Sequence, residues 1–166
     1  MGTVKDGWQG RFFEDFEVGD IYRCRYGRTI TETDNTQFTL ITHNTNQIHF
    51  NRDYAAHTEW GKPLVNSLLT LSTAVGMGVT DISENGFALG FDKVRMPHPL
   101  FAGDTLYVEN EVLATRASQS RPGQGIVTTL TRGYNQHGDV VVEFERSVMV
   151  WTQEAAPAGD FPEPTR

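Results

Sequence analysis

The sequence lacks the features that would place it in several other classes of protein. It has one cysteine, Cys24, which excludes an internal disulfide framework and fits a reducing compartment. No apolar run approaches the roughly 20 residues of a membrane-spanning helix. The opening residues, MGTVKDGWQG, lack the apolar core of a signal peptide. We therefore expect a cytoplasmic protein that is neither exported nor embedded in a membrane.

Positive charge is also scarce. Fourteen Lys and Arg residues face 21 Asp and Glu residues, which gives a net charge of -7 at pH 7. This balance disfavours nucleic acid as a partner, although a local group of basic side chains can still hold an anionic small molecule. The glycines form no Walker or Rossmann pattern, and the histidine spacing matches no metal-ligand pattern. We predict no metal site.

The length of 166 residues fits one domain with its own core. The last stretch carries three of the seven prolines, in the residues EAAPAGDFPEPTR. We predict a single domain over residues 1–152 and a flexible C-terminal tail over residues 153–166.

Two segments have the patterns of helices. In the first, within residues 31–44, Thr31 or Thr33 is a candidate N-cap, and Phe38 and Ile41 are expected to face inward. The second begins at Pro63 and ends near Gly76 and Gly78. Its apolar residues cover most of the circumference, which predicts a helix wrapped on all sides.

The second half of the chain has the pattern of β-strands. Leu106, Val108, Val112 and Ala114 alternate with polar residues and are expected on one face. Two further segments are rich in β-branched and aromatic residues, GIVTTLTRGY and DVVVEFERSVMVW, and the NQHG between them has the character of a hairpin loop. With residues 21–30 and 86–95 this gives about five strands.

These elements predict an α+β fold. The economical packing is a curved, mostly antiparallel sheet of about five strands wrapped around one long buried helix, which is the hotdog architecture. An exposed sheet edge or an open helix face would favour pairing of two units, so we expect a homodimer or a higher homo-oligomer.

The segment THNTNQIHFN, residues 42–51, concentrates histidines and amides without a carboxylate. Together with the rest of the chain it resembles the MaoC-like hydratases of the hotdog superfamily. FFEDFEVGD followed by GRTITETDNTQF looks like the family's opening, MPHPLFAGDTL like its pre-strand turn, and GKPLVNSLLTL like the start of its central helix. The family's motif G-D-x-N-P-x-H matches at Asn46 and His49, whereas its Gly, Asp and Pro are replaced by His43, Asn44 and Gln47.

The resemblance implies a hydratase or dehydratase that adds or removes water across the C2=C3 bond of an enoyl-CoA thioester. The collective pattern looks more like the subgroup acting on branched dicarboxylic esters, such as mesaconyl- or itaconyl-CoA. In that subgroup an Asn-Thr or Asn-Ser pair stands where the aspartate would be, which implies a modified site and not an inactive one. The CoA thioester is then the substrate, and no cofactor is expected.

The residues assigned to catalysis follow from this chemistry. His49 is the candidate base, because the ordinary pKa of an imidazole lies near neutral pH. Asn44 could orient water or hold the thioester but cannot take a proton, and Asn46 completes the motif. Asn66 and Ser67, at the start of the central helix, are the candidates for stabilising the thioester oxygen. The missing carboxylate could come from Glu32, Asp34 or Asp53, and the sequence does not choose among them.

Cations are needed to hold the phosphates of CoA and a carboxylate on the acyl group. The candidate binding residues are Lys62, Arg95, Arg116 and Arg121. Other readings stay open for this site. An oxyanion site and a positioned water would also serve a hotdog acyl-CoA thioesterase. If Asn44 only forms a turn after the preceding helix, the chain could be a non-catalytic acyl-CoA-binding protein.

Overall fold

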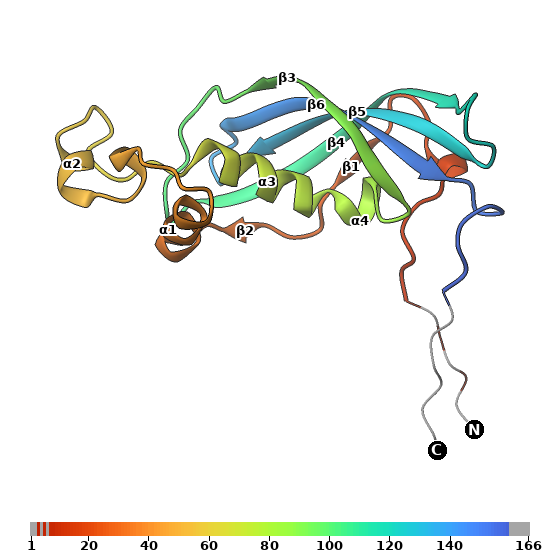
Figure 1. The fold of residues 1–166 in the computed structure, drawn as a ribbon, viewed down its shortest axis with the longest axis horizontal. Helices are drawn as coiled ribbons and strands as arrows, with labels where there is room; N and C mark the ends of the chain where they lie inside the picture. The colour runs from red at the N-terminus through yellow and green to blue at the C-terminus, as the bar shows by residue number, and fades with distance from the viewer. Residues whose placement is uncertain (1–2, 4, 6, 160–166) are drawn as a thin grey trace.

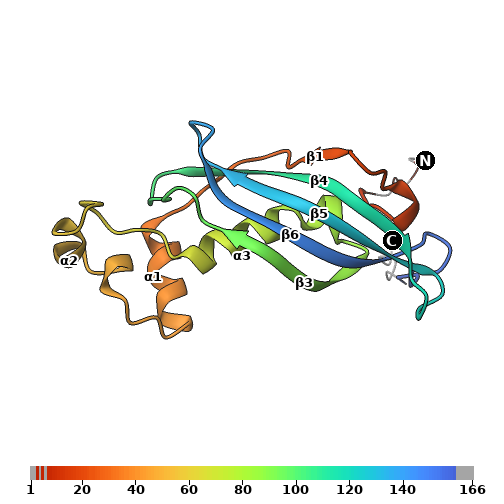
Figure 2. The same cartoon turned by 90° about the horizontal axis from the view of Figure 1, so that it is seen from above.

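The fold is built on one antiparallel sheet. The computed structural model describes residues 3, 5 and 7–159. The long strands are β3 (Gly86–Arg95), β4 (Thr105–Ala117), β5 (Gln124–Tyr134) and β6 (Val140–Trp151), and the short ones are β1 (Ile21–Arg23) and β2 (Arg28–Thr29). The order is β1-β4-β5-β6-β3, and β2 also pairs with β4 (Figure 1). β1 and β3 therefore form the two edges of the sheet, as Figure 2 shows from above.

The predicted strand over residues 21–30 is divided into β1 and β2, so the sheet has six strands where about five were expected. A bend at residues 25–26 separates the two pieces. Both pair only with β4. An edge segment can bend in this way because its other side has no ladder to maintain.

The predicted alternation along β4 holds only for its first half. Leu106, Val108 and Val112 are buried, but Ala114 is exposed. The register with β5 shifts between Val112 and Ala114. A bulge of this kind adds one residue and reverses the phase of the side chains beyond it. The prediction for Ala114 was therefore wrong. The predicted hairpin loop after β5 is confirmed, because the Asn135 N–H donates to the Asp139 carbonyl oxygen over 3.0 Å.

The central helix lies along the inner face of the sheet (Figures 1 and 2). It consists of α3 (Ser67–Met77) and the short α4 (Val79–Ile82), and its N-cap is Asn66. It starts after Pro63 because the Asn66 Oδ1 accepts the Leu68 N–H over 2.9 Å and fixes the first turn there. Thr70, Ala74 and Met77 are buried, whereas Leu68 is 57% exposed. One sheet covers only one side of a helix, so the prediction that it is wrapped on all sides was wrong for the single chain.

Residues 31–66 form a helical arm beyond one end of the sheet (Figure 1). The arm contains α1 (Glu32–Ile41), the 3₁₀ turn η2 (Gln47–His49) and α2 (Arg52–Ala56). The predicted N-cap Thr31 is confirmed, and it forms a reciprocal capping box with Asp34. The prediction for the inward face of α1 was wrong at Ile41, which is 75% exposed. The helix is buried instead through Asn35 and Thr39, four residues apart on one face.

The first residues of the predicted C-terminal tail are attached to the domain. The Gln153 N–H donates to the carboxylate of Glu14 over 3.2 Å, and the Ala155 N–H donates to the Thr152 carbonyl oxygen over 3.2 Å. Residues 160–166 of that tail lie outside the described part of the chain. In the described part, no helix is long and apolar enough to cross a membrane.

Candidate active site

The segment that follows α1 is a compact turn. His43 has a left-handed backbone, with φ of 51°. Its N–H donates to the Leu40 carbonyl oxygen over 3.2 Å, and the Asn44 N–H donates to the Thr39 carbonyl oxygen over 2.9 Å. These two bonds close the C-terminus of α1 as a Schellman motif. His43 therefore ends the helix.

The two motif asparagines support the backbone of this turn. The Asn44 Oδ1 accepts the Asn46 N–H over 2.9 Å, and the Asn46 Oδ1 accepts the Ile48 N–H over 3.3 Å. Both contacts are Asx turns, in which a side-chain amide replaces a backbone acceptor. Of the roles considered for Asn44, this geometry supports the turn, because its carbonyl oxygen is already used there.

His49 is held by the strand-like segment that leads into α3. Its Nδ1 lies 2.9 Å from the Leu64 carbonyl oxygen. A carbonyl oxygen only accepts hydrogen bonds, so Nδ1 carries the hydrogen in this contact and the neutral ring presents Nε2 as an acceptor. The half-buried imidazole is therefore set in the tautomer that a general base at Nε2 requires.

Asn35 connects this histidine to the start of α3. Its Nδ2 donates to the His49 carbonyl oxygen over 2.8 Å and to the Leu64 carbonyl oxygen over 3.1 Å, and its Oδ1 accepts the Asn66 N–H over 2.8 Å. Asn35 is 3% exposed. The sequence reasoning missed this residue. The signal that could have revealed it is an amide on the buried face of α1, because an amide buried in a core requires partners.

A pocket of about 150 Å³ opens beside His49. Its lining residues are Glu32, Asn35, Thr36, His49, Phe50, Arg52, Lys62, Pro63 and Ala102. We call it the His49 pocket. Glu32 and Arg52 form an ion pair at its mouth.

Of the three carboxylates considered as replacements for the missing aspartate, only Glu32 lines this pocket. Asp34 belongs to the capping box and pairs with Arg28, with 3.0 Å between Arg28 Nη2 and Asp34 Oδ1. The hydrogen bond from the Thr31 N–H lowers the pKa of Asp34, aided by the Thr31 hydroxyl and by Arg28. Asp53 lies in the first turn of α2.

A second pocket, of about 190 Å³, lies at the start of α3. Ser67 and Thr70 contribute polar groups, and the rest of the lining is mostly apolar: Trp60, Leu64, Val65, Met96, Pro97, Pro99, Leu100 and Val141, with His98. The Asn66 N–H is already bound to Asn35, so it is not free to contact a ligand. The Ser67 N–H belongs to the helix turn whose N–H groups lack acceptors within the helix. Of the two predicted donors, Ser67 is the better placed.

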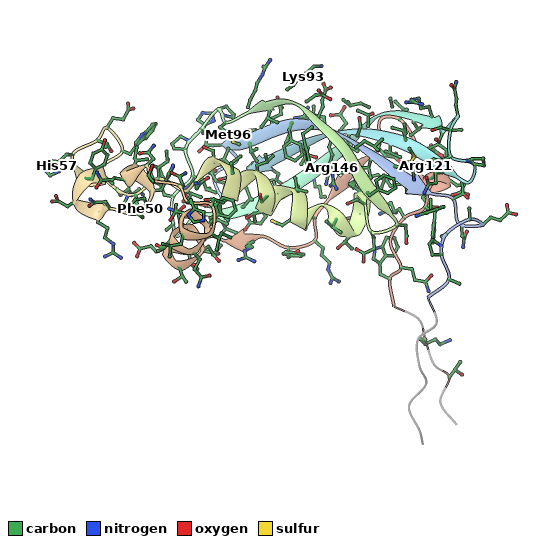
Figure 3. The ribbon with its side chains drawn as sticks, in the orientation of Figure 1. Phe50, His57, Lys93, Met96, Arg121 and Arg146 are labelled. Atoms are coloured by element: carbon green, nitrogen blue, oxygen red, sulfur yellow. The ribbon has the colours of Figure 1, made fainter. Side chains whose placement is uncertain are left out.

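The predicted cations fall into two groups. Lys62 lines the His49 pocket, and Arg95 is exposed beside Met96, which lines the apolar pocket. Arg116 lies roughly 33 Å along β4 from Leu106, at about 3.3 Å per residue. Figure 3 shows Arg121 at the opposite end of the molecule from Phe50 and His57. A single chain therefore does not bring Arg116 and Arg121 to the His49 pocket.

Among the residues that the structure describes, no three His, Cys, Asp or Glu side chains gather closely enough to hold a metal ion.

The fold and the site together define a class of protein. The sheet and helix match one half of a double hotdog protein from Mycobacterium tuberculosis, with a TM-score of 0.81 at 22% identity over 91% of this chain and 47% of that one. A MaoC domain protein from Chloroflexus aurantiacus, described as a dehydratase, matches with a TM-score of 0.85 at 30% identity, over 98% of this chain and 46% of that one. The chain is thus a single hotdog unit of MaoC type.

The particular family follows from the sequence. The family model of mesaconyl-CoA hydratase matches residues 3–162, and the chain belongs to that family. The mesaconyl-CoA hydratase of Cereibacter sphaeroides is 32% identical over 158 residues, which are 94% of this chain and 45% of that protein. The chain therefore spans less than half the length of the curated relative.

Proposed function

We propose that this chain is a hydratase/dehydratase that adds or removes water across the C2=C3 bond of an enoyl-CoA thioester. The observation that carries the proposal is His49, whose Nδ1 is bound to the Leu64 carbonyl oxygen and whose ring lines a pocket with a carboxylate and two cations. Family membership supports the same reaction. The reaction needs no cofactor, because the thioester itself accepts the developing charge.

In the direction of hydration, water attacks C3 and forms the new C–O bond. His49 Nε2 takes the proton that water loses, and the electron pair of the double bond moves toward the thioester oxygen. The Ser67 N–H, with the positive end of the α3 dipole, stabilises that oxygen. The protonated His49 then returns this proton to C2, which completes the addition of one water and restores the neutral imidazole. Glu32 supplies the carboxylate that the motif lacks and holds the attacking water.

A dicarboxylic acyl group fits the charges around His49. Lys62 and Arg52 line the same pocket, and the Lys62 Nζ is oriented over the Phe101 ring, 4.2 Å from its centroid. A substrate carboxylate beside these cations would compete with Glu32 for Arg52. We therefore propose a branched dicarboxylic substrate of the mesaconyl- or itaconyl-CoA kind.

We also propose that two hotdog units pair along β3. The exposed apolar side chains along that edge are Phe87, Leu89, Phe91 and Val94, and Leu68 of α3 is exposed as well. The curated relative is about twice as long as the match, which leaves room for a second unit in that protein. The Arg121 guanidinium lies 5.4 Å from the Phe87 ring centroid, next to this edge. In a homodimer, Arg121 and Arg116 would hold the CoA phosphates of the partner's substrate.

An assay that distinguishes hydration of the C2=C3 bond from cleavage of the thioester bond tests the proposal. Loss of enoyl absorbance and release of free thiol are followed for crotonyl-, mesaconyl- and itaconyl-CoA. We expect loss of enoyl absorbance without thiol release, and the largest kcat/KM for the dicarboxylic esters. Thiol release as the main reaction would identify a thioesterase instead. Equal kcat/KM for crotonyl-CoA and the dicarboxylic esters would contradict the substrate assignment.

A further inference from the structure

A third pocket, of about 420 Å³, lies near the β1 edge of the sheet, away from β3. The N-terminal segment, the bend after β1 and α4 enclose it. Its lining residues are Trp8, Arg11, Arg23, Cys24, Arg25, Tyr26, Thr80 and Asp81. We call it the arginine pocket. It shares no residue with the His49 pocket or the apolar pocket. Thr80 lies roughly 20 Å along the helix axis from Ser67, at 1.5 Å per residue.

The arginine pocket concentrates positive charge in a chain with few cations. Three of the 14 Lys and Arg residues converge on it, in a protein of net charge -7. Arg11 lies 3.4 Å from Asp81, and Arg23 lies 3.2 Å from Glu109. Arg25 is exposed and forms no ion pair with any residue that the structure describes. Three guanidinium groups against two carboxylates leave an excess of one positive charge.

The Arg11 side chain is only partly used by its neighbours. Its Cζ lies over two aromatic rings, 5.1 Å from the Trp8 centroid and 4.2 Å from the Tyr22 centroid. Its Nε is buried and finds no hydrogen-bond partner in the described part of the chain. These contacts orient the guanidinium, so its Nη groups are preorganised for an anion, whereas the buried Nε is not accessible to one.

Aromatic rings complete the lining. Trp8 is 60% exposed and Tyr26 is 50% exposed. The indole N–H of Trp8 donates to the Thr80 carbonyl oxygen over 3.2 Å, which holds the ring at the wall of the pocket. An exposed ring that is held in place is a stacking surface for a planar base.

We propose that the arginine pocket binds a phosphorylated nucleoside, with the base on Trp8 or Tyr26 and the phosphates on Arg25, Arg23 and Arg11. Phosphate alone would use only the guanidinium groups, and an apolar ligand would use only the rings. Two sources carry this chemistry: the nucleotide end of CoA, and a free nucleotide that acts as an effector. A free nucleotide would make this site independent of the proposed hydratase chemistry. Binding of the CoA end rests on the proposed function, and it would replace Arg116 and Arg121 as the residues that hold the CoA phosphates.

Calorimetry and quenching of tryptophan fluorescence test the proposal without turnover. Adenosine 3′,5′-bisphosphate, ATP, adenosine and inorganic phosphate are titrated into the full chain and into its His49→Ala variant. We expect saturable binding of a nucleotide to both proteins, tighter than that of adenosine or phosphate. Preference for the 3′,5′-bisphosphate assigns the CoA end, and preference for ATP assigns a free nucleotide.

Two variants and a control locate the binding. Arg25→Ala should weaken nucleotide binding about tenfold or more, the effect of one lost charge-assisted contact. Trp8→Phe keeps an aromatic ring but loses the hydrogen bond to Thr80, so it should weaken nucleotide binding less than Arg25→Ala does. Arg28→Ala removes an arginine outside the pocket and should leave binding unchanged. No saturable binding at millimolar nucleotide, or equal binding by Arg25→Ala and the unchanged chain, would overturn the proposal.

Discussion

The sheet and the helical arm of residues 31–66 differ in the interactions that fix them. Strands β4, β5 and β6 pair along most of their length, and their inner face presents fully buried side chains such as Leu106, Phe144 and Val148. The arm has short helices, and its fixed points are contacts of amide, hydroxyl and imidazole side chains with the backbone. Burial in the sheet is spread over many residues, whereas the geometry around His49 depends on a few polar contacts.

The largest effect on stability is expected in the sheet. Phe144→Ala removes a fully buried ring and should lower the free energy of unfolding by about 3–5 kcal/mol. Leu40→Ala, in the arm, removes a side chain that is 69% exposed and should change it by less than about 0.5 kcal/mol. Chemical denaturation of both variants measures the difference. Similar losses for the two would show that the arm has a core comparable to that of the sheet.

A smaller loss of stability with a larger effect on activity is expected at Asn35. Asn35→Ala leaves the Asn66 N–H and two carbonyl oxygens without their partner, which should cost about 1–3 kcal/mol. Because His49 and the start of α3 lose their shared anchor, kcat should fall more than KM rises. Asn35→Asp keeps the acceptor for the Asn66 N–H and should recover part of kcat.

Asn51→Ala is the matched control for Asn35, because the Asn51 Oδ1 caps α2 through the Tyr54 N–H over 3.1 Å. It should lower stability by about 1 kcal/mol and leave the pH dependence of kcat unchanged. The pH profile of Asn35→Ala should shift. If the two variants lose kcat equally and with the same pH profile, Asn35 has only a structural role.

A modest effect on stability, with no direct effect on the site, is expected at the capping box that begins the arm. Thr31→Ala should lower stability by about 1 kcal/mol. The Thr31 N–H holds the pKa of Asp34 below its ordinary value in the folded chain. Ionised Asp34 therefore stabilises the folded chain. This contribution is complete above the unfolded-state pKa of about 3.9, and it is lost as pH falls through the lower pKa of the folded state.

Denaturation of Asp34→Asn and the unchanged chain from pH 3 to pH 7 measures this contribution. The stability difference should be largest near pH 7 and shrink below pH 4. A difference that stays constant across this range would show that the carboxylate charge plays no part.

The sheet could be predicted because apolar and polar residues alternate along its strands. The arm could be predicted only in part, because it is held by contacts of individual polar side chains. The period-two pattern of β5 and β6 indicates which of their residues face the core. The two strands and the hairpin loop between them could therefore be predicted from the sequence. The bulge after Val112 leaves no such signature, and Ala114 was therefore assigned to the wrong face. Thr31 was identifiable as an N-cap because capping depends on residues three apart in the sequence.

The site was predictable where it follows a motif and not where it depends on contacts between distant segments. His49 and Asn46 could be placed from the family motif, and the Asx turn of Asn44 involves residues two apart. The contacts of Asn35 span 14 to 31 residues of sequence, so no local pattern shows them. The same limit applies to Glu32, which reaches the His49 pocket only because α1 folds back against η2.

The most direct test of the His49 pocket as the active site is the activity of His49→Ala with mesaconyl-CoA, measured beside that of Asn44→Ala. General-base catalysis contributes about 10²–10⁴-fold, so His49→Ala should lose at least about 100-fold in kcat while its thermal unfolding stays near that of the unchanged chain. Asn44→Ala should lose less, because it leaves the imidazole and its bond to Leu64 in place. Full activity in His49→Ala would contradict the assignment of this pocket as the active site.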